Sequence, residues 1–94
     1  MTIILKFLGA LRHASGTDKV ALEYREHVSI LDLVKAATQH APVLRRNLID
    51  EHLEDPKPNA LILVNGREIS VLNGLATEVH DGDEIVFVPV VHGG

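Results

Sequence analysis

Two glycines, Gly93 and Gly94, close the sequence and are its most informative candidates for chemistry. Neither has a Cβ, so an extended segment of this kind can enter a channel that is too narrow for other side chains. The carboxylate of Gly94 ionises near pH ~3.5 and is a poor electrophile, so acyl transfer from it requires activation to a mixed anhydride such as an acyl-adenylate. On composition alone, a frayed chain end is the commoner explanation of such a pair. Two hypotheses follow: a tail that is threaded into a partner and activated there, or a passive terminus.

Any such activation must come from another protein. The sequence contains neither the GxxxxGK[ST] phosphate loop nor a GxGxxG turn, so ATP binding is assigned to a partner. It also contains no cysteine, which excludes a cysteine nucleophile and thiolate metal sites. A chain of 94 residues suits one domain and leaves little room for a deep enclosed active site. We therefore expect a carrier or cosubstrate rather than an enzyme.

Charge and hydropathy exclude several other classes. Thirteen acidic against nine basic side chains give a net charge of −4, and the longest basic run is Arg45-Arg46, so direct nucleic-acid binding is not expected. No apolar stretch approaches the ~20 residues of a membrane span and no signal-peptide pattern is present, which predicts a cytoplasmic protein. The six histidines show no HxH, HExxH or clustered spacing, so no metal or other cofactor is expected; they are His13, His27, His40, His52, His80 and His92.

Two strands are predicted in the first part of the chain. Thr2 to Leu8 is rich in β-branched and aliphatic residues, carries Lys6 as its only charge and ends at Gly9. After a predicted turn over Gly16-Thr17-Asp18, the segment Val20 to Arg25 has the period-two pattern of a half-buried strand. We expect the two strands to form a hairpin.

One amphipathic helix is predicted to begin at Ser29. Asp32 follows three residues later and forms an Asp version of the capping box, which satisfies free N–H groups at a helix start. Apolar residues then recur at helical spacing until Pro42 interrupts, at Ile30, Leu33, Val34, Ala37 and Ala41. A second short helical segment is expected over Val43 to Leu53, and Glu54 to Asn59 is predicted to be a polar, proline-rich loop.

The remaining pattern is typical of strands and turns. Ala60 to Val64 is a continuous apolar run and predicts a central strand, Arg67 to Val71 predicts a short strand, and Glu84 to Val90 predicts the last one. Turns are predicted at Asn65-Gly66, Leu72 to Leu75 and Asp81 to Asp83. The order β-β-α-β-β-β predicts an α+β protein, with a mixed sheet of four to five strands packed on one main helix. We assign residues 1–90 to this domain and residues 91–94 to a flexible tail.

Strand parity predicts a docking surface. Lys6 and Glu84 are charged and should face water, which places the even positions of their two strands outside. Four apolar side chains then become exposed, Leu8, Val86, Val88 and Val90. Together with His92, which belongs to the tail and precedes the two glycines, they form a candidate docking site for an activating enzyme. The alternative is ordinary burial under a loop or helix, because a slip of one residue inverts the assignment.

Three segments carry a resemblance that covers nearly the whole chain. They are Leu11-Arg12 with Gly16-Thr17-Asp18, then Val64-Asn65-Gly66, and finally Asp81-Gly82-Asp83-Glu84-Ile85 through Pro89 to Gly93-Gly94. In these residues the chain resembles the β-grasp sulfur carriers and protein modifiers: the small subunit of molybdopterin synthase, Urm1 and the archaeal ubiquitin-like small modifiers. The resemblance implies a β-grasp fold and adenylation of Gly94 by an E1-like enzyme, with Gly93 giving a slim approach. Conversion to a thiocarboxylate, or attachment to lysine, would follow.

The subtype hypotheses differ in partner and destination. Val91-His92-Gly93-Gly94 resembles the Leu-His-Gly-Gly ending of Urm1, and Leu72 to Leu75 resembles the archaeal modifiers. This similarity implies a modifier that also carries sulfur, with a sulfur donor, a tRNA thiolation enzyme or target-protein lysines as partners. One alternative is the small subunit of molybdopterin synthase, which would insert its tail into a larger subunit and supply sulfur for the molybdenum cofactor. Another is a β-grasp domain that binds partners without covalent chemistry.

Overall fold

A mixed sheet forms the centre of the protein, in the computed structural model that describes residues 1–39, 41–49 and 60–90. Within these ranges, five strands lie in the order β2-β1-β7-β4-β5. Their bounds are β1 Thr2–Phe7, β2 Lys19–Glu23, β4 Ala60–Val64, β5 Arg67–Glu68 and β7 Glu84–Pro89. β1 and β7 run parallel, whereas the other neighbouring pairs are antiparallel. The sheet confirms the predicted α+β class and strand count.

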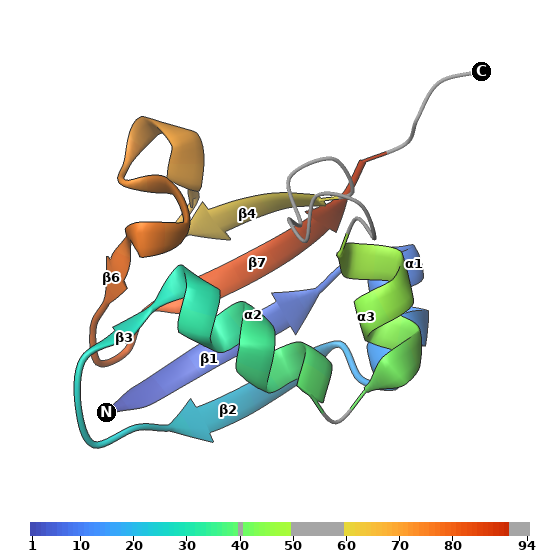
Figure 1. Cartoon of the computed structure of the whole chain (residues 1–94), viewed down its shortest axis with the longest axis horizontal. Helices are drawn as coiled ribbons and strands as arrows, with labels where there is room; N and C mark the ends of the chain where they lie inside the picture. The colour runs from blue at the N-terminus through green and yellow to red at the C-terminus, as the bar shows by residue number, and fades with distance from the viewer. Residues whose placement is uncertain (40, 50–59, 91–94) are drawn as a thin grey trace.

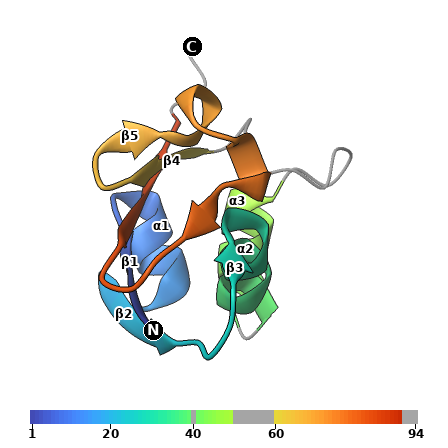
Figure 2. The same cartoon turned by 90° about the vertical axis from the view of Figure 1, so that its left-hand side faces the viewer.

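The helices lie on one side of this sheet (Figure 1; Figure 2). They are α1 Ala10–Ser15, α2 Ile30–Gln39 and α3 Pro42–Leu48. The helix α2 has ten residues and is the main helix that the sequence predicts. Two 3₁₀ helices, η1 Ile69–Val71 and η2 Gly74–Ala76, follow β5, and a separate small sheet joins β3 Val28–Ser29 to β6 Glu78–Val79.

Alternating side chains of the three central strands form the core beneath α2 and α3. Because β1 and β7 are in register at Lys6 and Val86, their odd positions point together toward the helices. The rings of Phe7 and Phe87 stack with centroids 5.2 Å apart. The buried inward residues of these strands are Ile3, Leu5, Phe7, Ala60, Ile62, Val64, Ile85 and Phe87. This parity leaves the even positions of β1 and β7 on the opposite, outer face.

The predicted capping box is present at the start of α2. The Ser29 N–H donates to Asp32 Oδ2 at 3.0 Å, and the Asp32 N–H donates to Ser29 Oγ at 3.2 Å. Hydrogen bonds from the Ser29 backbone and hydroxyl lower the pKa of the Asp32 carboxyl below its ordinary value, and Lys35 contributes in the same direction. The helix α2 spans Ile30–Gln39, so Ala41, which the predicted apolar stripe includes, lies outside it and precedes the first residue of α3.

Removing this cap tests its contribution. We expect Ser29→Ala to lower the free energy of unfolding by about 1 kcal/mol at neutral pH, because a free N–H of the first turn loses its acceptor. The folded-state pKa of Asp32 is depressed, so its stabilisation is present above pH ~4 and is lost as the pH falls through the folded-state pKa. The deficit of the variant should therefore shrink on acidification. Urea denaturation at neutral and acidic pH measures the stability loss of Ser29→Ala. Ser70→Ala, at an exposed serine, is the control. An equal loss in the control would contradict the assignment of Ser29 as the cap of α2.

The connection between the first two strands differs from the prediction. β1 and β2 are antiparallel neighbours as expected, but α1 joins them instead of a simple turn, and β1 ends at Phe7 rather than Leu8. The helix has six residues and buries only Leu11, so it has no helical repeat that a sequence pattern could reveal. The later helical segment was predicted over Val43 to Leu53, but α3 begins at Pro42 and ends at Leu48, because Ile49 already has an extended backbone. Residues 50–53 of that prediction and the predicted loop at 54–59 lie outside the described residues.

The segment after β4 also departs from the prediction. The strand predicted over Arg67 to Val71 pairs only through Glu68, because the Glu68 carboxylate accepts a hydrogen bond from the Ser70 N–H and caps η1. The turn predicted at Leu72 to Leu75 overlaps η2, and the two-residue strand β6 was not predicted. The turn at Asn65-Gly66 is confirmed: Asn65 has a φ of +50° and its Nδ2 donates to Asp83 Oδ1 at 2.9 Å. This bond ties it to the predicted turn before β7.

Candidate functional site

The outer sheet face carries two of the apolar residues that parity predicts, Val86 and Val88, together with Leu61 and Leu63, which were not predicted. We use this name for the outward side chains Ile4, Lys6, Leu61, Leu63, Glu84, Val86 and Val88, which the strand register places on one surface. The helices lie on the opposite side of the sheet (Figure 2). Leu61 is 44% exposed, and the other four apolar side chains are half-buried. An apolar strip bordered by charges is typical of a protein interaction surface.

The charged residues confirm the parity argument. Lys6 Nζ lies 3.2 Å from Glu84 Oε2, and both side chains are substantially exposed. An exposed pair of this kind adds little to stability. The pair instead shows that the even residues of β1 and β7 face outward on the same side of the sheet.

The predicted docking residues occupy two levels of exposure. Leu8 follows β1, is 45% exposed, and its N–H donates to the Phe87 carbonyl oxygen at 3.1 Å. Val86 and Val88 are half-buried, because they pair across the sheet with Leu63 and Leu61. Val90 is also half-buried and follows the last strand. The structure therefore brings Leu8 and the valines to the same end of β1 and β7, and their role in docking stays a prediction.

Sequence reasoning missed Leu61 and Leu63. The run Ala60 to Val64 is apolar at every position, so the sequence predicts a central strand but contains no alternation that would mark its outward side chains. Only the antiparallel register with β7, which sets Leu61 opposite Val88, shows that alternate residues of the run face outward. An antiparallel register fitted between the two strands is the signal that could have identified Leu61 and Leu63.

A shallow depression beside Leu8 adds positive charge to this region. Lys6, Arg12 and Lys19 line it with Asp18, and because Lys6 is paired with Glu84, one positive charge remains in excess. This local excess contrasts with the net charge of −4 of the whole chain. It favours a partner whose contacting surface is acidic.

A close backbone contact fixes the end of β7. Gly9 adopts a φ of +54° and a ψ of −132°, and a Cβ placed there would lie 3.0 Å from Pro89 Cγ. Pro89 is the last residue paired in the sheet, opposite Ala60. The glycine therefore sets the position from which the chain leaves the sheet. Gly93, Gly94 and His92, the predicted tail residues, lie outside the described residues.

Substitution of Gly9 tests this contact. We expect Gly9→Ala to lower the free energy of unfolding by about 2 kcal/mol, because the side chain adds backbone strain and presses on Pro89. Gly16→Ala is the matched control, since Gly16 has a φ of +81° but its added Cβ would meet nothing within 4 Å. Chemical denaturation compares the two variants. Equal losses would show that the contact with Pro89 does not constrain the strand end.

Neither a metal centre nor a membrane helix is found in the described part of the chain. No group of three or more histidine, aspartate or glutamate side chains there could hold a metal ion. None of the helices in those ranges is long and apolar enough to cross a bilayer.

The mixed sheet, the parallel central pair and the single main helix define a ubiquitin-like β-grasp protein. The solution structure of small archaeal modifier protein 1 from Methanosarcina acetivorans has the same fold, with a TM-score of 0.84 and 30% identity over 99% of this chain and 96% of that one. The chain belongs to the ThiS family, whose model matches residues 5–94. Family and fold confirm the predicted membership of the β-grasp sulfur carriers and ubiquitin-like modifiers.

A curated relative matches over its full length. Small archaeal modifier protein 3 from Haloferax volcanii is 29% identical over 94 residues, which are the whole of both chains. Solved structures with this fold include complexes with a second protein. One is the complex of subunits 1 and 2 of molybdopterin-converting factor from Helicobacter pylori, with a TM-score of 0.64 and 21% identity over 100% of both chains. At that identity the match shows the fold alone.

Proposed function

We propose that this chain is a cosubstrate whose Gly94 carboxylate is adenylated by an E1-like partner and then used for sulfur transfer, for conjugation to lysine, or for both. Three observations support the proposal: the family match extends to Gly94, the full-length relative is a protein modifier, and an apolar face leads to the last strand. The family match carries most weight, because it includes the reactive end. The chain supplies the acyl group, and its partners supply the catalysis.

The proposed sulfur chemistry has three steps. A Gly94 carboxylate oxygen attacks the α-phosphorus of ATP and pyrophosphate leaves, which gives the acyl-adenylate. The terminal sulfur of a donor persulfide then attacks the activated carbonyl and AMP leaves; a second thiol cleaves the resulting acyl disulfide, giving the thiocarboxylate and a donor disulfide. For conjugation, a lysine amine attacks the activated carbonyl instead. Because the sequence has no cysteine, the sulfur atom that is transferred must come from a partner.

Docking through the outer sheet face would position the tail for this reaction. Leu8 and Leu61 supply exposed apolar surface, and Val88 connects them to the end of β7. Burial of such residues at an interface supplies affinity, and the cations beside Leu8 would steer an acidic partner surface toward it. The predicted partner-binding residues Val86 and Val90 lie in and directly after β7, and His92 follows Val90 two positions later in the sequence.

Mass spectrometry of the C-terminal peptide tests the proposal. The protein is incubated with an E1-like enzyme, ATP and a persulfide donor and then cleaved with trypsin. Cleavage after Arg67 releases residues 68–94, which contain no lysine, arginine or methionine. Exchange of one oxygen for sulfur in this peptide is therefore not confused with oxidation of Met1, which adds nearly the same mass. An unmodified peptide beside an enzyme that activates another carrier would contradict the proposal and favour a passive binding domain.

A further inference from the structure

The strand β2 forms an open edge of the sheet in the described structure. Met1 and Tyr24 exchange two backbone hydrogen bonds, of 2.7 and 2.9 Å, and the Phe7 N–H donates to the Asp18 carbonyl oxygen at 2.9 Å. In an antiparallel pair, bonded and non-bonded positions alternate, so residues 18, 20, 22 and 24 face β1. The backbone N–H and C=O groups of Lys19, Ala21 and Glu23 consequently point away from the sheet.

Only the first of these three positions is satisfied within the described residues. The Lys19 N–H donates to Thr17 Oγ1 at 3.3 Å, and the Thr17 hydroxyl donates to the Lys19 carbonyl oxygen at 2.9 Å. The outward groups of Ala21 and Glu23 have no partner in the same ranges. Unpaired groups on a strand edge are a template for another strand.

The sequence of β2 is complementary to itself when reversed. Lys19-Val20-Ala21-Leu22-Glu23, read against an antiparallel copy centred on Ala21, sets each lysine opposite a glutamate and each valine opposite a leucine. We propose that β2 pairs with β2 of a second copy of this chain around a two-fold axis at Ala21. The two sheets then form one continuous sheet, with an isologous contact.

On the outward side of β2, charge favours this occupant over an unrelated strand. Lys6 lies beside Lys19 across the β1–β2 ladder, but Lys6 is ion-paired with Glu84. Glu23 accepts a hydrogen bond from the Thr2 hydroxyl at 2.6 Å, and no cation is paired with it in the described part of the chain. Lys19 likewise has no acidic partner there. The proposed pairing supplies both missing counter-ions, twice by symmetry, while Ala21 leaves the axis free of bulky side chains.

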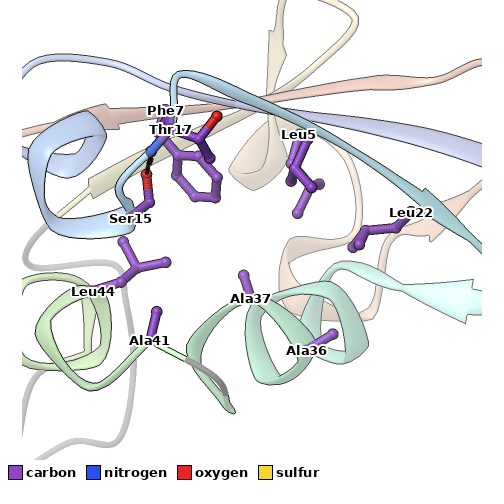
Figure 3. A pocket seen from close by; sticks show the side chains of 10 residues that line it. Leu5, Phe7, Ser15, Thr17, Leu22, Ala36, Ala37, Ala41 and Leu44 are labelled. Atoms are coloured by element: carbon purple, nitrogen blue, oxygen red, sulfur yellow. Dashed lines mark hydrogen bonds between the residues drawn. The ribbon is translucent and has the colours of Figure 1, made fainter.

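On the inward side, an open apolar groove accommodates the same contact. Leu5, Phe7 and Leu22 on the sheet face Ala37, Ala41 and Leu44 on the helical side, around a space of about 220 Å³ (Figure 3). Val20 also lines the groove, and both Val20 and Leu22 are only half-buried. In the proposed pair, Val20 lies opposite Leu22 of the second copy at a non-hydrogen-bonded position, where side chains approach most closely. Each copy thereby covers the groove edge of the other.

The dimer should be weak and detectable at high concentration. Five residues per copy bury far less than the ~800 Å² per partner of a standard interface. Sedimentation equilibrium of the full chain, from about 10 μM to about 1 mM at low ionic strength, should show a monomer converting to a dimer. A monomer throughout this range would overturn the proposal and leave the edge to a partner peptide or to solvent.

Two sets of variants locate the contact. Ala21→Pro removes an outward N–H at the axis without removing a hydrogen bond to β1, and should weaken the dimer at least about tenfold. Lys19→Glu and Glu23→Lys, made singly, oppose like charges at both ends and should each weaken it about tenfold, whereas the double exchange should restore it. Circular dichroism checks that each variant is folded. If Ala21→Pro leaves the dimer unchanged, the β2 contact is wrong. It is also wrong if the double variant is folded but does not recover the dimerisation of the parent chain.

Discussion

A chain that lacks Gly94 is expected to lose at least a hundredfold in the rate of adenylation. Its last carboxylate would belong to Gly93 and would lie about 3.5 Å short of the original position in an extended segment. A displacement of about 1 Å at a reacting atom already costs roughly a hundredfold in rate. Pyrophosphate release by the E1-like enzyme, measured at saturating ATP with full-length and shortened chains, gives the ratio directly.

A second variant separates the effect of tail length from the effect of side-chain width at residue 93. Gly93→Val keeps the carboxylate at its original distance but adds a β-branched side chain, so a narrow channel should again reduce the rate about a hundredfold. Both variants should keep the unfolding midpoint of the parent chain, because the substitutions lie outside the domain assigned to residues 1–90. Adenylation at the parental rate in either variant would contradict the corresponding requirement.

Leu61→Asp is expected to lower kcat/KM for adenylation by about a hundredfold while the domain stays folded. Leu61 lies on the outer sheet face near the start of β4, opposite Val88, and is 44% exposed. A carboxylate there would have to lose its hydration when a partner covers the face, and no cation among the described side chains is positioned opposite it. The loss corresponds to about 2.7 kcal/mol of transition-state binding.

Leu31→Asp is the matched control for this prediction. Leu31 is 37% exposed and belongs to α2, on the opposite side of the sheet from Leu61. The two substitutions introduce the same charge at similarly exposed leucines, so the comparison isolates the side of the sheet on which the charge lies. Equal losses of kcat/KM would show that the outer sheet face is not the docking surface. That outcome would leave the chemistry of Gly94 untouched, because tail and face are tested by different variants.

Local signals predicted much of the fold. The capping box at Ser29, the turn at Asn65-Gly66 and the exposed charges Lys6 and Glu84 each depend on residues close in sequence or on a simple alternation, and the structure contains all of them. The short elements could not be predicted in this way. α1 buries a single side chain, and β6 exists only because two residues pair with β3, almost fifty positions earlier in the chain.

The sequence predicted some residues of the candidate site and missed others. Parity located Val86 and Val88 because Glu84 marks the outward side of their strand. Leu61 and Leu63 were missed because a run that is apolar throughout contains no alternation, and its outward side is set by pairing with β7. The role proposed for Gly94 depends on the family resemblance, since composition alone favours a frayed end.

The parallel pairing of β1 and β7 has a mechanical consequence. Thr2 begins β1 at one end of the sheet and Pro89 ends β7 at the other (Figure 1). A pull applied between these two ends loads the β1–β7 hydrogen bonds in shear, so they must rupture together rather than open one after another. Forced unfolding is governed by the height of that barrier and not by equilibrium stability alone. A domain anchored through its C-terminal end therefore resists tension along its length better than tension that peels β2 from the edge.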